Sequence, residues 1–333
     1  MECDGEGIGG EIVLDTTKKQ HYIWRYYLAP WTENGTKNGR IAILRDNYIS
    51  FKSLGSVAYE DYFYEIGELS EKELTVLRHM FIDKANGVER EILQELLDVY
   101  QLPYTFLNRF PPSLRDELKQ SPEFEHIKRQ TFENYHGKIE YTGKTYIDLL
   151  RQGNLHFWNI AEQRHDFVNF LCTQYFRTKQ TKEGVAFASS QGKELFGEDY
   201  LLDDVRPQNM WLPIALITAT KLGLSVATGG YGAILLHATE NSFIVGDQPI
   251  LNTHVTFDCT TKQKNKIASD QMELFCPITP QTALLVTKNQ NYQSGNVVEI
   301  GKQEVDQYNA LEWNYSSGQL FASSKELLEK FIT

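Results

Sequence analysis

The chain has 333 residues, of which 41% are hydrophobic and 12% aromatic, and this composition can fill the core of one large domain or two modest ones. Its formal net charge of -11 argues against a nucleic-acid coat protein and against a membrane-surface protein, because both depend on a net positive field. A locally basic groove is still consistent with that overall charge.

The sequence predicts a cytoplasmic protein that does not enter a membrane. Residues 1–7 are acidic and no apolar run follows them, so we expect no signal peptide. No stretch approaches the ~20 consecutive apolar residues that span a bilayer. The cysteines lack the spacing of a zinc site or a disulfide framework, which fits free thiols in a reducing cytosol; they are Cys3, Cys172, Cys259 and Cys276.

The first part of the chain combines a polar arm with aromatic and alternating segments. Residues 1–20 are polar and glycine-rich and are expected to form a flexible arm. Residues 21–31 are dense in aromatic side chains and predict a short buried helix. Residues 40–51 alternate around Asp46-Asn47, which is typical of a β-hairpin. Glu60 lies in a further aromatic segment.

The hydrophobic period becomes helical in the middle of the chain, from about residue 70 to 223. Ser70 followed by Glu73 has the pattern of a capping box, which marks the start of the first helix. Pro103 and the Pro111-Pro112 pair are expected to interrupt the helices that follow.

Polar residues extend an apolar helical face in the segment 166–178. Gln174 and Arg177 recur at the spacing of the apolar residues before them, so we expect both to be buried. A buried guanidinium needs a partner, and the carboxylate of Asp247 or Glu60 would serve. The alternative is that Arg177 extends past the helix end into solvent.

Strand patterns return in the last third. The apolar run 233–238, a turn at 239–242 and the run 243–246 predict a hairpin that carries Asp247 to the end of a sheet. Further strands are expected at 273–276 and 283–287, and closing helices at 305–313 and 325–332.

These elements predict an α+β fold, with a mostly helical centre and with the N-terminal β-hairpin and the C-terminal antiparallel sheet packed together. We expect residues 21–333 to form a single domain, because the candidate site residues come from distant segments that must meet.

Six short motifs occur in order along nearly the whole chain. They are His21 to Leu28 with Trp31, Glu60 with Phe63-Tyr64, Gln174 with Arg177-Thr178, Gly246 to Pro249, Pro277 to Pro280, and Asn309. In this order they resemble a bacterial family catalogued only as domain of unknown function 4238. Trp24, Gly246 and Gln248 depart from the family pattern of proline, serine and asparagine, which affects the turn at Asp247. The resemblance implies a common fold and a common pocket but no activity, because the family has no established one.

The motif residues predict a hydrolytic site for a phosphodiester or another anionic substrate. A histidine beside a carboxylate exchanges protons near neutral pH, an arginine binds a phosphate through parallel hydrogen bonds, and a glutamine orients water. A nucleic acid or nucleotide is the expected substrate. A divalent metal is chemically compatible, although no ligand spacing indicates one. The expected catalytic residues are His21, Glu60 and Asp247, and the expected substrate-binding residues are Gln174, Arg177 and Tyr64.

Three alternatives stay open at this point. The same residues are compatible with a structural polar network. Arg151 with His156, and Arg129 with His136, fit the loose arginine–histidine pattern of ribonucleases that resemble the higher-eukaryote and prokaryote nucleotide-binding family. A non-enzymatic module that binds through its aromatic residues is the third. By analogy with other orphan bacterial families, the protein is expected to act as an effector in a conflict system, with a protein partner in a defence complex.

Overall fold

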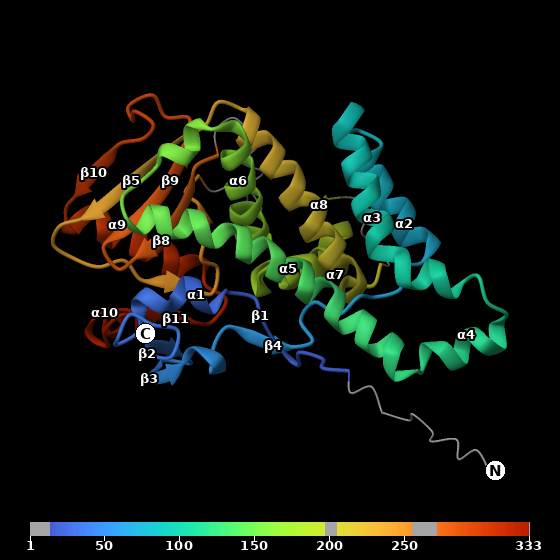
Figure 1. Ribbon diagram of the computed structural model, residues 1–333. Helices are drawn as coiled ribbons and strands as arrows, with labels where there is room; N and C mark the ends of the chain where they lie inside the picture. The colour runs from blue at the N-terminus through green and yellow to red at the C-terminus, as the bar shows by residue number, and fades with distance from the viewer. Residues whose placement is uncertain (1–13, 197–204, 255–271, 333) are drawn as a thin grey trace, which may run out of the picture.

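The computed structural model describes residues 14–196, 205–254 and 272–332. It confirms the α+β fold: the larger sheets lie at one end of the molecule and the helical segment 71–119 extends at the other (Figure 1). The long helix α5 (Pro122–Arg151) connects the two ends. The predicted arm, residues 1–20, lies mostly outside the described residues, and Lys19–His21 form strand β1.

The N-terminal segment forms a two-stranded sheet, a short helical turn and a hairpin. β1 pairs with β4 (Tyr59–Asp61), and a helical turn follows β1 as α1 (Arg25–Leu28) and η1 (Ala29–Trp31). The predicted hairpin is confirmed as β2 (Arg40–Arg45) and β3 (Tyr48–Ser53).

The turn of this hairpin has the conformation that its sequence favours. Asp46 and Asn47 have φ of 51° and 56°, the left-handed region that two-residue turns between twisted strands require. The turn η2 (Leu54–Ser56) then leads back to β4.

Helices make up the middle of the chain, as the periodicity predicts. α2 (Glu71–Leu77) begins with the predicted capping box, because Ser70 Oγ accepts from the Glu73 N–H and the Glu73 carboxylate accepts from the Ser70 N–H. The other helices here are η3 (Arg78–Ile82), α3 (Gly87–Leu107), α4 (Pro112–Lys119), η4 (His156–Asn159), α6 (Ala161–Phe176), α7 (Lys179–Phe196) and α8 (Pro207–Thr228). The expected interruption at Pro103 is wrong, because Pro103 lies inside α3.

α8 is long and apolar enough to resemble a membrane span, which was not expected from the sequence. By length and composition alone it could cross a membrane, with 22 residues and a mean hydropathy of 1.5. In the fold it packs against α6, α7 and α3, and 67% of its apolar window is buried. Burial among these helices accounts for its composition.

Cys172 and Cys276 are buried free thiols, and Cys3 and Cys259 lie outside the described residues.

Two sheets contain the C-terminal strands. The five-stranded sheet has the order β10-β5-β9-β8-β7, and the four-stranded sheet has the order β3-β2-β11-β6. β2 pairs directly with β11, so the N-terminal hairpin and the C-terminal strands share one sheet. The bounds are β5 (Gly232–Ala238), β6 (Val245–Gly246), β7 (Leu251–Asn252), β8 (Leu274–Thr279), β9 (Thr282–Thr287), β10 (Val297–Ile300), α9 (Lys302–Tyr315), β11 (Leu320–Ala322) and α10 (Glu326–Glu329).

The predicted hairpin between residues 233–238 and 243–246 is wrong. β5 pairs with β9 and β10, whereas β6 pairs with β11 in the other sheet. The backbone between β5 and β6 is bound mainly by side chains instead, and the Phe243 N–H donates to the Pro280 carbonyl. Asn309 of α9 accepts from the Ile244 N–H and donates to the Ser242 carbonyl, and the Trp31 indole donates to the Phe243 carbonyl. These bonds satisfy the polar groups that a hairpin partner would have paired.

Gly143 fixes a close approach between α5 and α6. A Cβ atom at this position would lie 2.4 Å from the ring of Phe170. We expect Gly143→Ala to lower the free energy of unfolding by about 1–3 kcal/mol, because overpacking outweighs the better helix propensity of alanine. Gly184→Ala on α7 is the matched control: a Cβ there meets nothing within 4 Å, so that variant gains up to about 1 kcal/mol. Urea unfolding compares the two, and equal stability of both variants would contradict the close packing.

Candidate functional site

A small polar cavity lies where β1, α1, α5 and the end of α6 meet. Its volume is about 140 Å³. Four of its residues come from α5 at positions i, i+3, i+4 and i+7, a spacing that places them on one face of the helix. The lining residues are His21, Trp24, Arg25, Glu133, His136, Gly137, Glu140 and Arg177.

Arg177 is held rigidly at the cavity wall. Its side chain is 2% exposed, as the helical periodicity predicted. Nη2 donates to Glu140 and to the side-chain oxygen of Gln174, and Nε donates to the same oxygen of Gln174. Burial opposes the charge, but the carboxylate of Glu140 outweighs it and raises the pKa of Arg177 above its usual value. The partner is therefore Glu140, and not Asp247 or Glu60 as the sequence analysis expected.

His136 is buried in the cavity wall without a hydrogen-bond partner. It is 2% exposed, and neither ring nitrogen has a partner among the described residues. The rings of Tyr64 and Tyr135 pack on it at centroid distances of 4.3 and 5.4 Å. Burial, and then the charge of Arg177, hold its pKa well below the usual value, so the imidazole is neutral. A neutral imidazole with free nitrogens is able to accept a proton from a group in the cavity.

Glu133 lies one helical turn before His136 and its pKa is shifted in the opposite direction. Burial and the nearby carboxylate of Glu140 raise the pKa of Glu133 to about 7, although Arg177 and Arg25 oppose the shift. At neutral pH, a substantial fraction of this carboxyl group therefore carries a proton. At neutral pH the cavity thus contains a partly protonated carboxyl group beside an unprotonated imidazole.

His21 lines this cavity, whereas Tyr64 and Gln174 lie behind its wall, in contact with His136 and Arg177. Nε2 of His21 is 3.2 Å from the Leu54 carbonyl oxygen, and burial followed by the charge of Arg25 lowers its pKa to about 4. The Tyr64 hydroxyl donates to the His21 carbonyl, and the Gln174 amide donates to the Tyr22 carbonyl. These bonds tie β1 to α6 and fix the position of the His21 backbone.

Glu60 and Asp247 lie away from the cavity lining. Glu60 forms an ion pair with Lys182 of α7 at 2.6 Å. Asp247 follows β6 and is 2% exposed, and its carboxylate accepts from the N–H groups of Ser317 and Gln319 at 2.6 and 3.1 Å. Of the six expected site residues, His21 and Arg177 thus line the cavity, Tyr64 and Gln174 contact its wall from behind, and Glu60 and Asp247 lie elsewhere. The roles assigned to all six remain predictions.

Sequence reasoning missed most of the α5 contribution. It did not single out Glu133, Glu140 or Arg25, and it weighed His136 only as part of an arginine–histidine pair with Arg129. Arg129 is paired with Glu125 and Glu65, outside the cavity lining. The available signal was the spacing of Glu133, His136 and Glu140, which places three titratable groups on one face of a helix.

The residues of the other arginine–histidine pair have different surroundings. Arg151 donates to the backbone carbonyls of Tyr26 and Tyr27, whereas His156 is exposed on η4. The structure assigns no ligands to a metal: the described residues contain no group of three or more histidine, cysteine, aspartate or glutamate side chains arranged to hold one.

Comparison with known proteins identifies a family without a described activity. A search of the curated proteins finds no match, and neither does a search of the solved structures. The family model described as "Protein of unknown function (DUF4238)" matches residues 19–207 and 223–326, a range that contains every side chain lining the polar cavity. Because this match covers most of the sequence, the chain belongs to the DUF4238 family, as the motifs suggested.

Proposed function

We propose that the polar cavity binds an anionic group and that the protein is a hydrolase of phosphodiesters. The observation that supports this most is the shared cavity of His136, Glu133 and two arginines. Arg177 uses Nε and Nη2 for its internal bonds, so Nη1 is left to bind an anion. Arg25 is exposed, so it meets a substrate that enters from solvent. Guanidinium groups bind phosphate well because their N–H groups match its oxygens.

The reaction follows from the opposite pKa shifts of two neighbouring groups. Groups whose environments push their pKa values apart divide the roles of acid and base. Neutral His136 accepts a proton from the attacking water as the oxygen bonds to phosphorus. The bond from phosphorus to the leaving oxygen breaks, and that oxygen takes the proton of Glu133. Proton exchange with solvent then restores both groups.

The size of the cavity limits what enters it. At about 140 Å³ the cavity is smaller than the ~300–1,000 Å³ of sites that enclose a whole small molecule, so it accommodates a phosphate-sized group and not a whole nucleotide. The rest of the substrate therefore lies outside, beyond Arg25. This favours a single-stranded nucleic acid or a nucleotide, whose phosphate is accessible without opening a duplex.

The test measures cleavage of single-stranded RNA and DNA oligonucleotides and of bis(4-nitrophenyl) phosphate by the purified full-length protein. His136→Asn is expected to lower kcat by about 10²- to 10⁴-fold, the usual contribution of a positioned acid or base. The rate should also fall as the pH rises above about 7, because Glu133 then loses its proton. Glu133→Gln should be slow at every pH.

His156→Asn is the matched control, because this histidine is exposed and lies outside the cavity. Melting temperatures measured beside the rates separate a lost reaction from a lost fold. The proposal fails if the wild-type protein cleaves none of the three substrates, or if His136→Asn keeps full activity. Loss of activity in His156→Asn alone would favour the arginine–histidine ribonuclease.

A binding module without turnover is the second candidate. The hydrogen bonds of Gln174, Tyr64 and Asp247 run mainly to backbone groups, as in a structural network. This candidate predicts that oligonucleotides bind and survive, and that Arg177 rather than His136 determines affinity. For either candidate we propose a cytoplasmic location, supported by the buried free thiols Cys172 and Cys276.

A further inference from the structure

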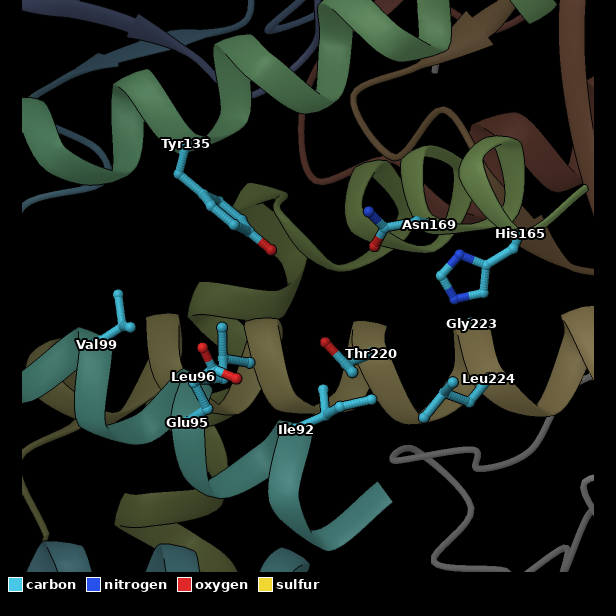
Figure 2. A pocket seen from close by; sticks show the side chains of 10 residues that line it. All are labelled: Ile92, Glu95, Leu96, Val99, Tyr135, His165, Asn169, Thr220, Gly223 and Leu224. Atoms are coloured by element: carbon cyan, nitrogen blue, oxygen red, sulfur yellow. The ribbon is translucent and has the colours of Figure 1, made fainter. Parts of the chain in front are cut away.

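A second cavity lies on the opposite side of α5, between α3, α6 and α8 (Figure 2). Its volume is about 300 Å³, at the lower end of the range for small-molecule sites. Helices α3 and α8 provide most of the lining residues, and Gly223 of α8 adds no side chain to fill the cavity. The apolar lining residues are Ile92, Leu96, Val99 and Leu224.

Polar groups from three helices point into this cavity. Figure 2 shows Tyr135 extending from α5 with its hydroxyl group toward Asn169 of α6, while Thr220 of α8 faces them from across the cavity. No hydrogen bond of the Tyr135 hydroxyl or of the Asn169 amide is found within the described residues. Thr220 donates to the Leu216 carbonyl, which leaves its oxygen free to accept. These phenol and amide groups are half-buried and can bond to water, and a ligand in the cavity would find both in place as hydrogen-bond partners.

The charge around the cavity is negative. Glu95 of α3 is exposed and lines the cavity, and the other titratable lining groups are His165 of α6 and the Tyr135 phenol; no lysine or arginine is among the described residues that line it. The adjoining groove on α3 adds Glu91 and Asp98 against a single arginine, Arg90. An anionic ligand would be repelled here, whereas a cation would be attracted to Glu95.

We propose that this cavity binds a small amine whose aromatic ring carries a hydrogen-bond donor. The ring would pack between Tyr135 and the aliphatic side chains of α3 and α8. The donor of the ring meets the Asn169 amide and the Tyr135 hydroxyl, and the ammonium group lies beside Glu95. This site differs from the polar cavity in its lining and its charge, so it does not depend on the proposed hydrolase activity.

Three indoles with matched ring systems test the proposal. Tryptamine is a cation, tryptophol is neutral and indole-3-propionate is an anion. Equilibrium dialysis against the full-length protein should show tryptamine binding most tightly and indole-3-propionate most weakly. Glu95→Gln should weaken tryptamine about 2- to 5-fold, the usual range for an exposed ion pair, and leave tryptophol unchanged. Asn169→Leu should weaken all three about 2- to 10-fold.

Two further variants locate the binding. Leu96→Trp fills the cavity and should abolish binding of all three indoles, whereas Glu117→Gln, an exposed change on α4, should alter nothing. Circular dichroism confirms that each variant is folded. The proposal is overturned if none of the indoles binds at millimolar concentration, if the three bind equally, or if the folded Leu96→Trp protein binds them as the wild type does.

Discussion

Arg177→Met is expected to lower the free energy of unfolding by about 3–5 kcal/mol, the usual cost of removing one partner of a buried ion pair. The substitution keeps much of the side-chain volume but removes every donor. The carboxylate of Glu140 and the side-chain oxygen of Gln174 both lose their hydrogen bonds to the guanidinium. Gln174 also fixes β1 through the Tyr22 carbonyl, so the loss spreads to the segment that carries His21. Urea unfolding at pH 7.5 measures the change.

Two other substitutions serve as controls for the unfolding free energy of Arg177→Met. Arg177→Lys keeps the charge but cannot reach Glu140 and Gln174 in the same fork geometry, so it should recover only part of the loss. Arg45→Met removes an arginine whose side chain is 65% exposed in its pair with Asp46, and it should cost less than about 1 kcal/mol. If Arg177→Met were no more harmful than Arg45→Met, the buried network would contribute nothing to stability.

The burial of Arg177 could be predicted from sequence, but its partner could not. Helical periodicity determines which face of residues 161–176 turns inward, and Arg177 continues that face. Periodicity carries no information about the opposite wall, which belongs to α5. Asp247 was an attractive candidate because it ends an apolar strand, yet Glu140 occupies the place beside the guanidinium.

The same distinction explains the two predicted hairpins. The hairpin at 40–53 forms because its turn residues, Asp46 and Asn47, specify the conformation locally. The pattern at 233–246 is equally strand-like, but Asn309, more than sixty residues further along, binds the backbone of residues 242–244. Local propensity cannot reveal a competitor that arrives from so distant a segment.

Only some residues of the polar cavity could be predicted from the sequence, for a related reason. His21 and Arg177 lie in short motifs and were expected to meet, which the cavity lining shows. His136 lies in the middle of a long amphipathic helix, where a lone histidine is more often a core residue. Only the orphaned ring nitrogens of His136 distinguish it from such a residue, and they become evident only when its surroundings are known.

Asp247→Ala is expected to lower the free energy of unfolding by about 2–4 kcal/mol, because it leaves two partly buried N–H donors without their acceptor. Those donors belong to Ser317 and Gln319, and the Asp247 N–H in turn donates to the Gln319 carbonyl. The carboxylate therefore ties the end of β6 to the turn before β11. The expected loss of unfolding free energy is smaller than the sum for two hydrogen bonds to a charged group, because burial destabilises the Asp247 carboxylate in the wild type.

Asp247→Asn keeps a side-chain oxygen that accepts a hydrogen bond but removes the titratable charge, so it measures the two contributions separately. Burial raises the pKa of Asp247 to about 6, although the two N–H donors oppose the shift. A raised carboxyl pKa gives stability that is present at low pH and is lost as the pH rises through about 6. The wild type should therefore gain stability relative to Asp247→Asn, which does not titrate, as the pH falls from 7.5 to 4.5. Shifts that do not depend on Asp247, such as those of the histidines, cancel in this difference, whereas the part of the raised Glu312 pKa that comes from the Asp247 charge does not.

Activity measured on the same two variants decides between the scaffold and the catalytic role of Asp247. A scaffold predicts that Asp247→Asn, the milder change, keeps kcat within a few-fold of the wild type, and that Asp247→Ala loses activity only in proportion to its unfolded fraction. A catalytic carboxylate predicts the reverse: Asp247→Asn would lose about 10²-fold or more in kcat with its melting temperature unchanged. The position of the carboxylate, against the 317–319 turn and away from the cavity lining, favours the scaffold.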